Sequence, residues 1–151
     1  MPFIFYREEN AMYINTYEYL PKEAQEIREV VFMKEQGFCN EFDEIDSYAK
    51  HLVLFDKKNP IATCRFFRHE SCEDYFIGRI AVIKEYRGKN IGASLLKAAE
   101  SQIRNIGGKR IFLHAQCKAK EFYEKQGYKS YGEVVLEEGC PHIWMFKNIE
   151  P

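Results

Sequence analysis

Apolar positions along the chain alternate between the short repeat of strands and the longer repeat of helices. Strand-like runs cover Met12–Thr16, His51–Phe55, Ile61–Phe67, Tyr75–Val82, Arg110–Ala115, Tyr128–Leu136 and His142–Phe146. Helical spacing predicts helices from Pro21 to the stop at Gly37, from Ile91 to Ile106, and from Ala119 to Gln126. This alternation of strands and helices predicts an α/β fold.

The connections between these elements predict part of the sheet. The polar turn at residues 56–60 is short and ends in proline, so the strands on either side of it form a hairpin. The strand at 75–82 and the strand at 110–115 are separated by a complete helix. Such a crossover places the two strands parallel to each other.

Length, composition and charge restrict the class of protein. A chain of 151 residues with 46% hydrophobic and 30% charged residues predicts one folded domain over residues 1–151. Its 22 basic and 23 acidic side chains give no basic excess for a nucleic-acid partner, and no apolar run is long enough for a membrane partner. The five cysteines are scattered without a C-x-x-C pair, which favours reduced thiols, a cytoplasmic location and no metal site.

The turn at residues 87–93 carries the strongest chemical signal. It lies between a strand and a helix, where Gly88 and Gly92 let backbone amides approach a ligand. The helix N-terminus adds partial positive charge, and Arg87 and Lys89 add full charges. We therefore predict a phosphate cradle. It is neither a Walker A loop, because Asn90 follows Lys89, nor a G-x-G-x-x-G dinucleotide loop.

Two ordered motifs identify a family. R-G-x-x-I-G-x-x-L-L follows I-G-R-I-A-V, and A-x-x-F-Y-x-x-x-G-Y begins at Ala119. Together they resemble the GCN5-related N-acetyltransferases, or GNAT superfamily. The run Ile27–Gly37, the Glu44-Ile45-Asp46 loop and the Gly139-Cys140-Pro141-His142 turn resemble its small ElaA-like branch. This resemblance covers nearly the whole chain and implies a mixed central sheet with a splayed parallel strand pair, flanked by helices.

The resemblance also implies a co-substrate and its contacts. Acetyl-CoA would be the acetyl donor, and no metal would be needed. Ile80, Ala81 and Val82 would pair by backbone with the pantetheine arm, one free N–H polarising the thioester carbonyl. The pyrophosphate would bind Arg87, Gly88, Lys89, Asn90, Ile91, Gly92 and Ala93, and Gln116 would add a further cofactor contact. Asn90 replaces a family glycine and Gln116 a common asparagine. Asparagine tolerates the left-handed backbone that the loop requires.

The implied activity is acetyl transfer to a primary amine of a small molecule or peptide, by direct attack in a ternary complex. Tyr123 occupies the family's general-acid position and would protonate the departing thiolate. The base remains open among Glu41, Glu44, Asp46 and His142, and the acidic residues could instead bind the acceptor's ammonium group. His51 and His114 fall inside predicted strands, which favours structural roles.

Two alternatives to direct acetyl transfer remain open. Cys117 precedes a helix N-terminus and could act as an acyl-accepting nucleophile, with His114 three residues away. The fold could also serve as a non-catalytic acyl-CoA sensor or interaction domain. A homodimer through the last strands is a further expectation, and the acidic loop at 41–46 favours a cationic acceptor.

Overall fold

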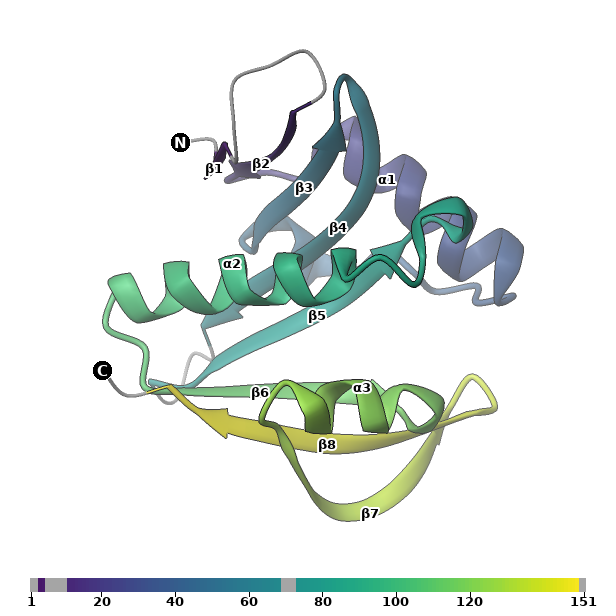
Figure 1. Ribbon diagram of the computed structural model, residues 1–151. Coiled ribbons are helices and arrows are strands. Elements are labelled where there is room, and N and C mark those ends of the chain that lie inside the picture. Colours follow the sequence, from purple (N-terminus) through teal and green to yellow (C-terminus); the bar gives the residue numbers. More distant parts are fainter. Residues whose placement is uncertain (1–2, 5–10, 69–72, 150–151) are drawn as a thin grey trace.

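A twisted sheet forms the centre of the computed structural model, which describes residues 3–4, 11–68 and 73–149. Its strands are β1 (Phe3–Ile4), β2 (Met12–Tyr17), β3 (Lys50–Asp56), β4 (Asn59–Arg68), β5 (Tyr75–Val82), β6 (Arg110–Gln116), β7 (Lys129–Glu137) and β8 (Cys140–Asn148). In the described residues these eight strands pair in the order β1-β2-β3-β4-β5-β6-β8-β7 (Figure 1). All pairs are antiparallel except β5 with β6. The mixed sheet and its parallel pair confirm the predicted fold class.

Helices cover both faces of this sheet. The α-helices are α1 (Lys22–Arg28), α2 (Ile91–Asn105) and α3 (Lys120–Lys125); the other helical segments are η1 (Glu29–Glu35), η2 (Glu44–Ser47), η3 (Lys84–Tyr86) and η4 (Cys117–Ala119). α2 and α3 lie on one face, and α1 with η1 lies on the other (Figure 1). The central strands are therefore buried on both sides.

Strand β3 shows how the sequence produces this layering. Leu52 and Leu54 pack in the core beneath α2, whereas Val53 and Phe55 point the other way and pack against α1. The uninterrupted apolar run is therefore that of a strand covered on both faces. Each such side chain contributes about 1.5–3 kcal/mol through removal from water.

The first helix differs from the sequence expectation. It begins after Pro21 as predicted, but from Glu29 to Glu35 it widens into a π-helix before Gly37 turns at φ +81°. In this wider turn Val31 and Phe32 are buried, while Val30 is 43% exposed.

The parallel pair β5–β6 opens along its length. Within the described residues the two strands pair at Tyr75 with Ile111 and at Phe76 with Phe112, and no further. Beyond Phe76, β5 continues to Val82 and β6 continues to Gln116 while the strands diverge (Figure 1). This is the predicted splayed pair.

Two further features of the described residues concern membrane-spanning helices and the cysteine thiols. No helix among the described residues is long and apolar enough to cross a membrane. The cysteines within the described ranges, Cys39, Cys64, Cys117 and Cys140, are free thiols; Cys72 lies outside those ranges.

Candidate active site

A cavity of about 640 Å³ opens where β5 and β6 separate. Its lining includes Phe32 from η1 on one face of the sheet and Tyr123 from α3 on the other. The cavity therefore lies in the gap of the sheet and is lined by residues from both of its faces. Its volume lies in the range of about 300–1,000 Å³ that is typical of small-molecule sites.

The turn before α2 has the backbone geometry of an anion site. Gly88 and Asn90 both adopt left-handed conformations, with φ of +79° and +61°. Asn90 thus takes the conformation that was expected of it. The first turn of α2 receives no side-chain cap, so its amides at residues 91–93 retain hydrogen-bonding capacity at the positive end of the helix. These are the features that a pyrophosphate requires.

Arg87 and Lys89, the two cations of the turn, already have partners within the chain. The Arg87 guanidinium makes a two-point ion pair with Glu35, and its Nε donates to the carbonyl oxygen of Val82 at 2.9 Å. This arginine lowers the pKa of the Glu35 carboxyl. The ammonium of Lys89 lies 5.3 Å from the centre of the Tyr86 ring. An anion at the loop would compete with Glu35 for Arg87.

Strand β5 supplies an open edge and a bulge beside this turn. Ala81 and Val82 pair with β4, but on the β6 side the strand has no ladder partner beyond Phe76 in the described chain. Between Gly78 and Ala81 the register with β4 shifts, and Arg79 adopts φ +50°. Such a bulge turns backbone groups out of the ladder at Arg79 and Ile80. The edge can accept an extended chain, as an added strand would be accepted.

Tyr123 lines the cavity from α3. Its ring packs edge-on against Phe122 and Tyr128, with centroids 5.0 and 6.1 Å away. Burial raises the pKa of its hydroxyl, so Tyr123 is protonated at neutral pH. The hydroxyl can therefore donate a proton or a hydrogen bond into the gap. Gln116 lines the same cavity, and its amide donates to Gln36 at 2.9 Å.

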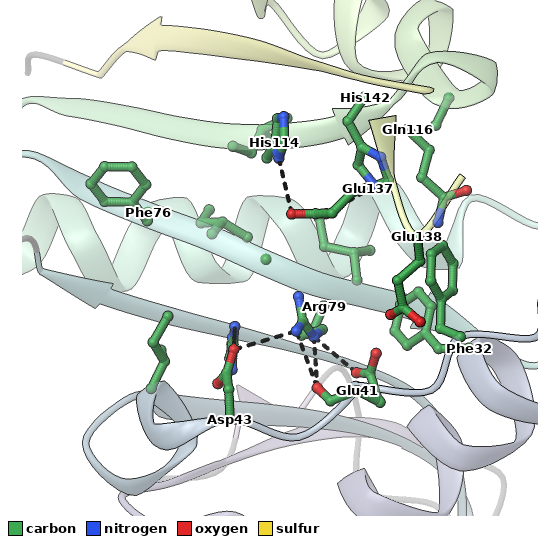
Figure 2. A pocket seen from close by; sticks show the side chains of 18 of the residues that line it. Phe32, Glu41, Asp43, Phe76, Arg79, His114, Gln116, Glu137, Glu138 and His142 are labelled. Carbon is green, nitrogen blue, oxygen red and sulfur yellow. Dashed lines mark hydrogen bonds and ion pairs between the residues drawn. The ribbon is translucent and has the colours of Figure 1, made fainter. Parts of the chain in front are cut away.

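Three of the acidic residues in the loop at 41–46, which we expected to suit a cationic acceptor, are paired with arginines. Arg28 and Arg65 both contact Asp46 Oδ1, at 2.7 and 2.8 Å. Arg28 also contacts Glu41, Arg65 contacts Asp43, and Arg79 contacts both of these acids (Figure 2). Three guanidinium groups thus balance the three carboxylates of Glu41, Asp43 and Asp46.

Two of the predicted acceptor residues, Glu44 and Asp46, do not line the cavity. Asp46 is only 6% exposed and lies outside the cavity lining. Burial alone would raise the pKa of its carboxyl, but its arginine partners outweigh burial and lower this pKa to about 2. Such a carboxylate is a poor base near neutral pH. Glu44 is exposed at the start of η2 and does not line the cavity. Glu41 and Asp43 line it instead, as members of the arginine network.

His142 lies in the cavity with one ring nitrogen fixed by the backbone. Its Nδ1 is 2.8 Å from the carbonyl oxygen of Cys140, and its Nε2 is 3.5 Å from Glu137 Oε2. Because a carbonyl oxygen only accepts, Nδ1 carries the proton. The lone pair of the neutral ring is then on Nε2, on the side of Glu137.

His114 lies beside His142 and also lines the cavity, although its place in a strand had favoured a structural role. The two rings are 5.0 Å apart, and the His114 ring stacks on Trp144 at 4.5 Å. Glu137 reaches toward both histidines, its Oε1 lying 3.8 Å from His114 Nδ1 (Figure 2). Burial is the main cause of a lowered His114 pKa, so this ring is neutral at pH 7.

The tip of the β7–β8 hairpin closes one side of the cavity. The carboxylate of Glu138 accepts the backbone N–H groups of Cys39 and Asn40, at 2.9 and 3.3 Å. It thereby ties the hairpin to the segment that follows η1. His51, in contrast, is buried outside the cavity lining, where its Nε2 lies 3.1 Å from the carbonyl oxygen of Asp46.

Sequence reasoning missed Arg79, His114 and Glu137 as cavity residues. One available signal was the polar Gly78-Arg79 pair inside an otherwise apolar strand, which is typical of a bulge. Cys117, the nucleophile of the alternative covalent route, is not in the cavity lining and packs against the main core. Within the described residues no group of three or more His, Cys, Asp or Glu side chains is arranged to hold a metal ion.

Known proteins share this sequence pattern and this architecture. Residues 17–149 match a family model described as an acetyltransferase (GNAT) domain. An uncharacterized N-acetyltransferase of Bacillus subtilis, YjcF, is 33% identical over 130 residues, covering 84% of this chain and 91% of its own length.

Solved structures extend the comparison. Escherichia coli ElaA superposes with a TM-score of 0.81 at 22% identity, over 90% of this chain and 99% of its own. An aminoglycoside 6'-N-acetyltransferase complexed with coenzyme A superposes with a TM-score of 0.74 at 18% identity, over 91% and 97%. At these identities the two structures establish a shared fold.

Proposed function

Because this chain belongs to the GNAT acetyltransferase family, we propose that it transfers an acetyl group from acetyl-CoA to the primary amine of a small molecule or peptide. The observation that carries the proposal is the cavity through the splayed sheet, with Tyr123 at one side and His142 at the other. A thioester entering from one face and an amine entering from the other would meet in this gap.

The donor would bind along β5 and the start of α2. The pyrophosphate would accept hydrogen bonds from the amides at residues 91–93, in the concavity formed by Gly88 and Asn90. Arg87 would exchange Glu35 for the phosphates, with Lys89 nearby. The pantetheine arm would pair with the open edge at Ile80, Ala81 and Val82, and Gln116 would face it from β6.

The reaction requires one new bond, one broken bond and three proton transfers. The amine nitrogen attacks the thioester carbonyl carbon, and the carbon–sulfur bond then breaks. A backbone N–H released by the bulge at Arg79 and Ile80 would stabilise the negative charge that develops on the carbonyl oxygen. The attacking ammonium must first lose a proton, the nitrogen must lose a second proton to solvent after the attack, and the departing thiolate must gain one.

Tyr123 would supply the thiolate's proton. Burial raises the pKa of its hydroxyl, which keeps it protonated at neutral pH. Desolvation in the same gap also raises the pKa of the coenzyme A thiol, so the departing thiolate is a stronger base than in water. The pKa values of the Tyr123 hydroxyl and of this thiol therefore rise together. The resulting tyrosinate would regain its proton from solvent.

His142 would take the proton of the acceptor ammonium. The carbonyl of Cys140 holds the Nδ1 proton, so the lone pair on Nε2 faces the cavity. Protonation at Nε2 would form an imidazolium beside the carboxylate of Glu137. Of the four base candidates, Asp46 is occupied by arginines, Glu44 lies outside the lining, and Glu41 is paired with Arg28 and Arg79.

The test is acetyl-CoA turnover with a panel of primary amines, measured as free thiol and as the mass of one acetyl group gained by the amine. We expect thiol release that depends on the amine. Calorimetric titration with coenzyme A, run in parallel, reports the donor site. Binding of coenzyme A without transfer to any amine would contradict the catalytic proposal and favour an acyl-CoA sensor.

A further inference from the structure

The charges around the acceptor side of the cavity are mostly paired. Glu41 and Asp43 face arginines, and Glu138 is held by two backbone amides. Glu137 is different: its side chain is 58% exposed, and the basic nitrogens found within 4 Å of its carboxylate in the described chain belong to the rings of His114 and His142. Burial lowers the pKa of His114, and the proposed base His142 must offer a lone pair, so neither ring supplies the Glu137 carboxylate with a positive partner.

The wall beside this carboxylate is aromatic. Phe67 stacks on Phe76 with centroids 5.4 Å apart, Phe76 meets Trp144 edge-on at 5.9 Å, and Trp144 stacks on His114 at 4.5 Å. All four rings line the cavity and come from different strands. Figure 2 shows Phe76 and His114 along the same opening toward which Glu137 extends.

A wall of this kind favours a flat apolar group. Rings bind a planar body by offset or edge-to-face stacking, which contributes about 0.5–1.5 kcal/mol for each pair beyond the burial of area. The carboxylate of Glu137 can hold one ammonium, whereas both oxygens of Glu138 already accept backbone N–H groups. The further ammonium groups of a polycation would find Glu41 and Asp43 already paired with arginines, and Lys118 lines the same cavity.

From this arrangement we infer that the acceptor is a monoamine with an aromatic body, its ammonium held by Glu137 and its ring packed against Phe76 and Trp144. The inference rests on the proposed acetyl transfer and specifies its acceptor. The ammonium would lie next to Nε2 of His142, which would take its proton before the attack. Polyamines and aminoglycosides would be poor acceptors for the same reason of charge.

Trp144 provides a readout that does not depend on turnover, because it is the chain's single tryptophan and lines the cavity. We would titrate the protein, with coenzyme A present, with 2-phenylethylamine, butylamine, spermidine and kanamycin, and follow Trp144 fluorescence. We expect 2-phenylethylamine to saturate at a concentration at least about tenfold below each of the others. Tighter binding of spermidine or kanamycin, or no saturable change with the aryl amine, would overturn the inference.

Two variants separate the contributions of ring and charge. Phe76→Leu should weaken 2-phenylethylamine binding about fivefold or more and leave butylamine nearly unchanged, whereas Phe76→Tyr, which keeps a ring, should retain binding. Glu137→Gln should weaken both amines and leave coenzyme A affinity unchanged. Controls are Tyr19→Leu, an exposed ring outside the cavity, and Glu133→Gln, an exposed carboxylate of β7 outside it.

Thiol release with the same amines distinguishes failure of this inference from failure of the proposed function. Acetylation that favours the polycations would overturn the assigned acceptor class and leave acetyl transfer standing. Absence of acetylation with every amine would contradict the transferase itself. Unchanged aryl-amine affinity in both Phe76→Leu and Glu137→Gln would contradict the assigned binding mode.

Discussion

The Nδ1 atom of His142 lies 2.8 Å from the carbonyl oxygen of Cys140, and this contact determines which ring nitrogen can accept a proton in the cavity. Both residues belong to β8, whose start at Cys140 brings the carbonyl next to the ring. The Cys140 carbonyl thus fixes the tautomer of His142 with the proton on Nδ1. Because His142 lines the opening between β5 and β6, its Nε2 is the nitrogen that can accept a proton there.

Replacing this ring should remove the proposed base. We expect His142→Gln to lower kcat/KM about 10²–10⁴-fold near neutral pH, since glutamine cannot take the ammonium's proton. Activity should recover partly at higher pH, where more of the free amine is already unprotonated. The pH profile of kcat/KM measures this. His51→Gln is the control: a structural loss there should lower the melting temperature without changing the shape of that profile.

Removing one hydroxyl tests the proposed acid. Tyr123→Phe keeps the ring's packing and should lower kcat about 10²–10⁴-fold, because the thiolate would depart without a proton donor. Coenzyme A affinity and melting temperature should change little. Tyr131→Phe, on the exposed strand β7, is the matched control and should keep normal kcat. Wild-type kcat in Tyr123→Phe, under conditions where chemistry limits the rate, would remove Tyr123 from the mechanism.

The start of α2 leaves little room for a larger side chain. A Cβ at Gly92 would lie 3.4 Å from Cζ of Phe122 and 3.8 Å from Cγ2 of Val82. Gly92→Val should therefore displace the helix start and weaken coenzyme A binding at least about tenfold, or about 1.4 kcal/mol. Gly92→Ala, with ordinary contacts, should have a much smaller effect. Calorimetry on both variants gives the comparison, and equal affinity in a folded valine variant would argue against the phosphate cradle.

The buried network around Asp46 should control acid stability. Its arginine partners lower the folded pKa of Asp46 from the ordinary 3.8 to about 2, so the unfolded chain binds more protons between these values. The contribution, about 2 kcal/mol, is complete above about pH 4 and is lost as pH falls through 2. Asp46→Asn should abolish this dependence and cost about 3–5 kcal/mol at neutral pH, because Arg28 loses a buried partner.

Urea unfolding at several pH values measures both effects of this substitution. Asp74→Asn, an ion-pair partner of Arg110 near the surface, provides a comparison in which a much smaller loss is expected. If Asp46→Asn retained the wild-type slope of stability against pH, the network would not be the source of the acid sensitivity.

Local pattern was sufficient for most of the fold. The helix between the strands at 75–82 and 110–115 predicted a parallel pair. The left-handed geometry found at Asn90 was implied by the family resemblance, in which a glycine takes this position. The short strand β1 was not predicted, since two residues carry no periodicity. The π-helical turn at 29–35 was also missed, because apolar spacing alone does not show a change in helical pitch.

The partners of charged residues were harder to predict. Asp46 and Glu44 look alike in the sequence, yet of these two it is Asp46 that contacts Arg65 on β4. Glu137 looks like an ordinary exposed residue of an edge strand, and it acquires its role because β8 carries His142 next to His114. Such pairings are set by strand register across the sheet, which the hydrophobic pattern does not encode for polar side chains.

Direct attack of an amine on the thioester, with both substrates held in one cavity, is tested most directly by initial rates over a matrix of acetyl-CoA and amine concentrations. The account predicts double-reciprocal lines that intersect, because both substrates must be bound before the acetyl group moves. Parallel lines would contradict it, since they indicate an acetylated enzyme intermediate formed before the amine binds.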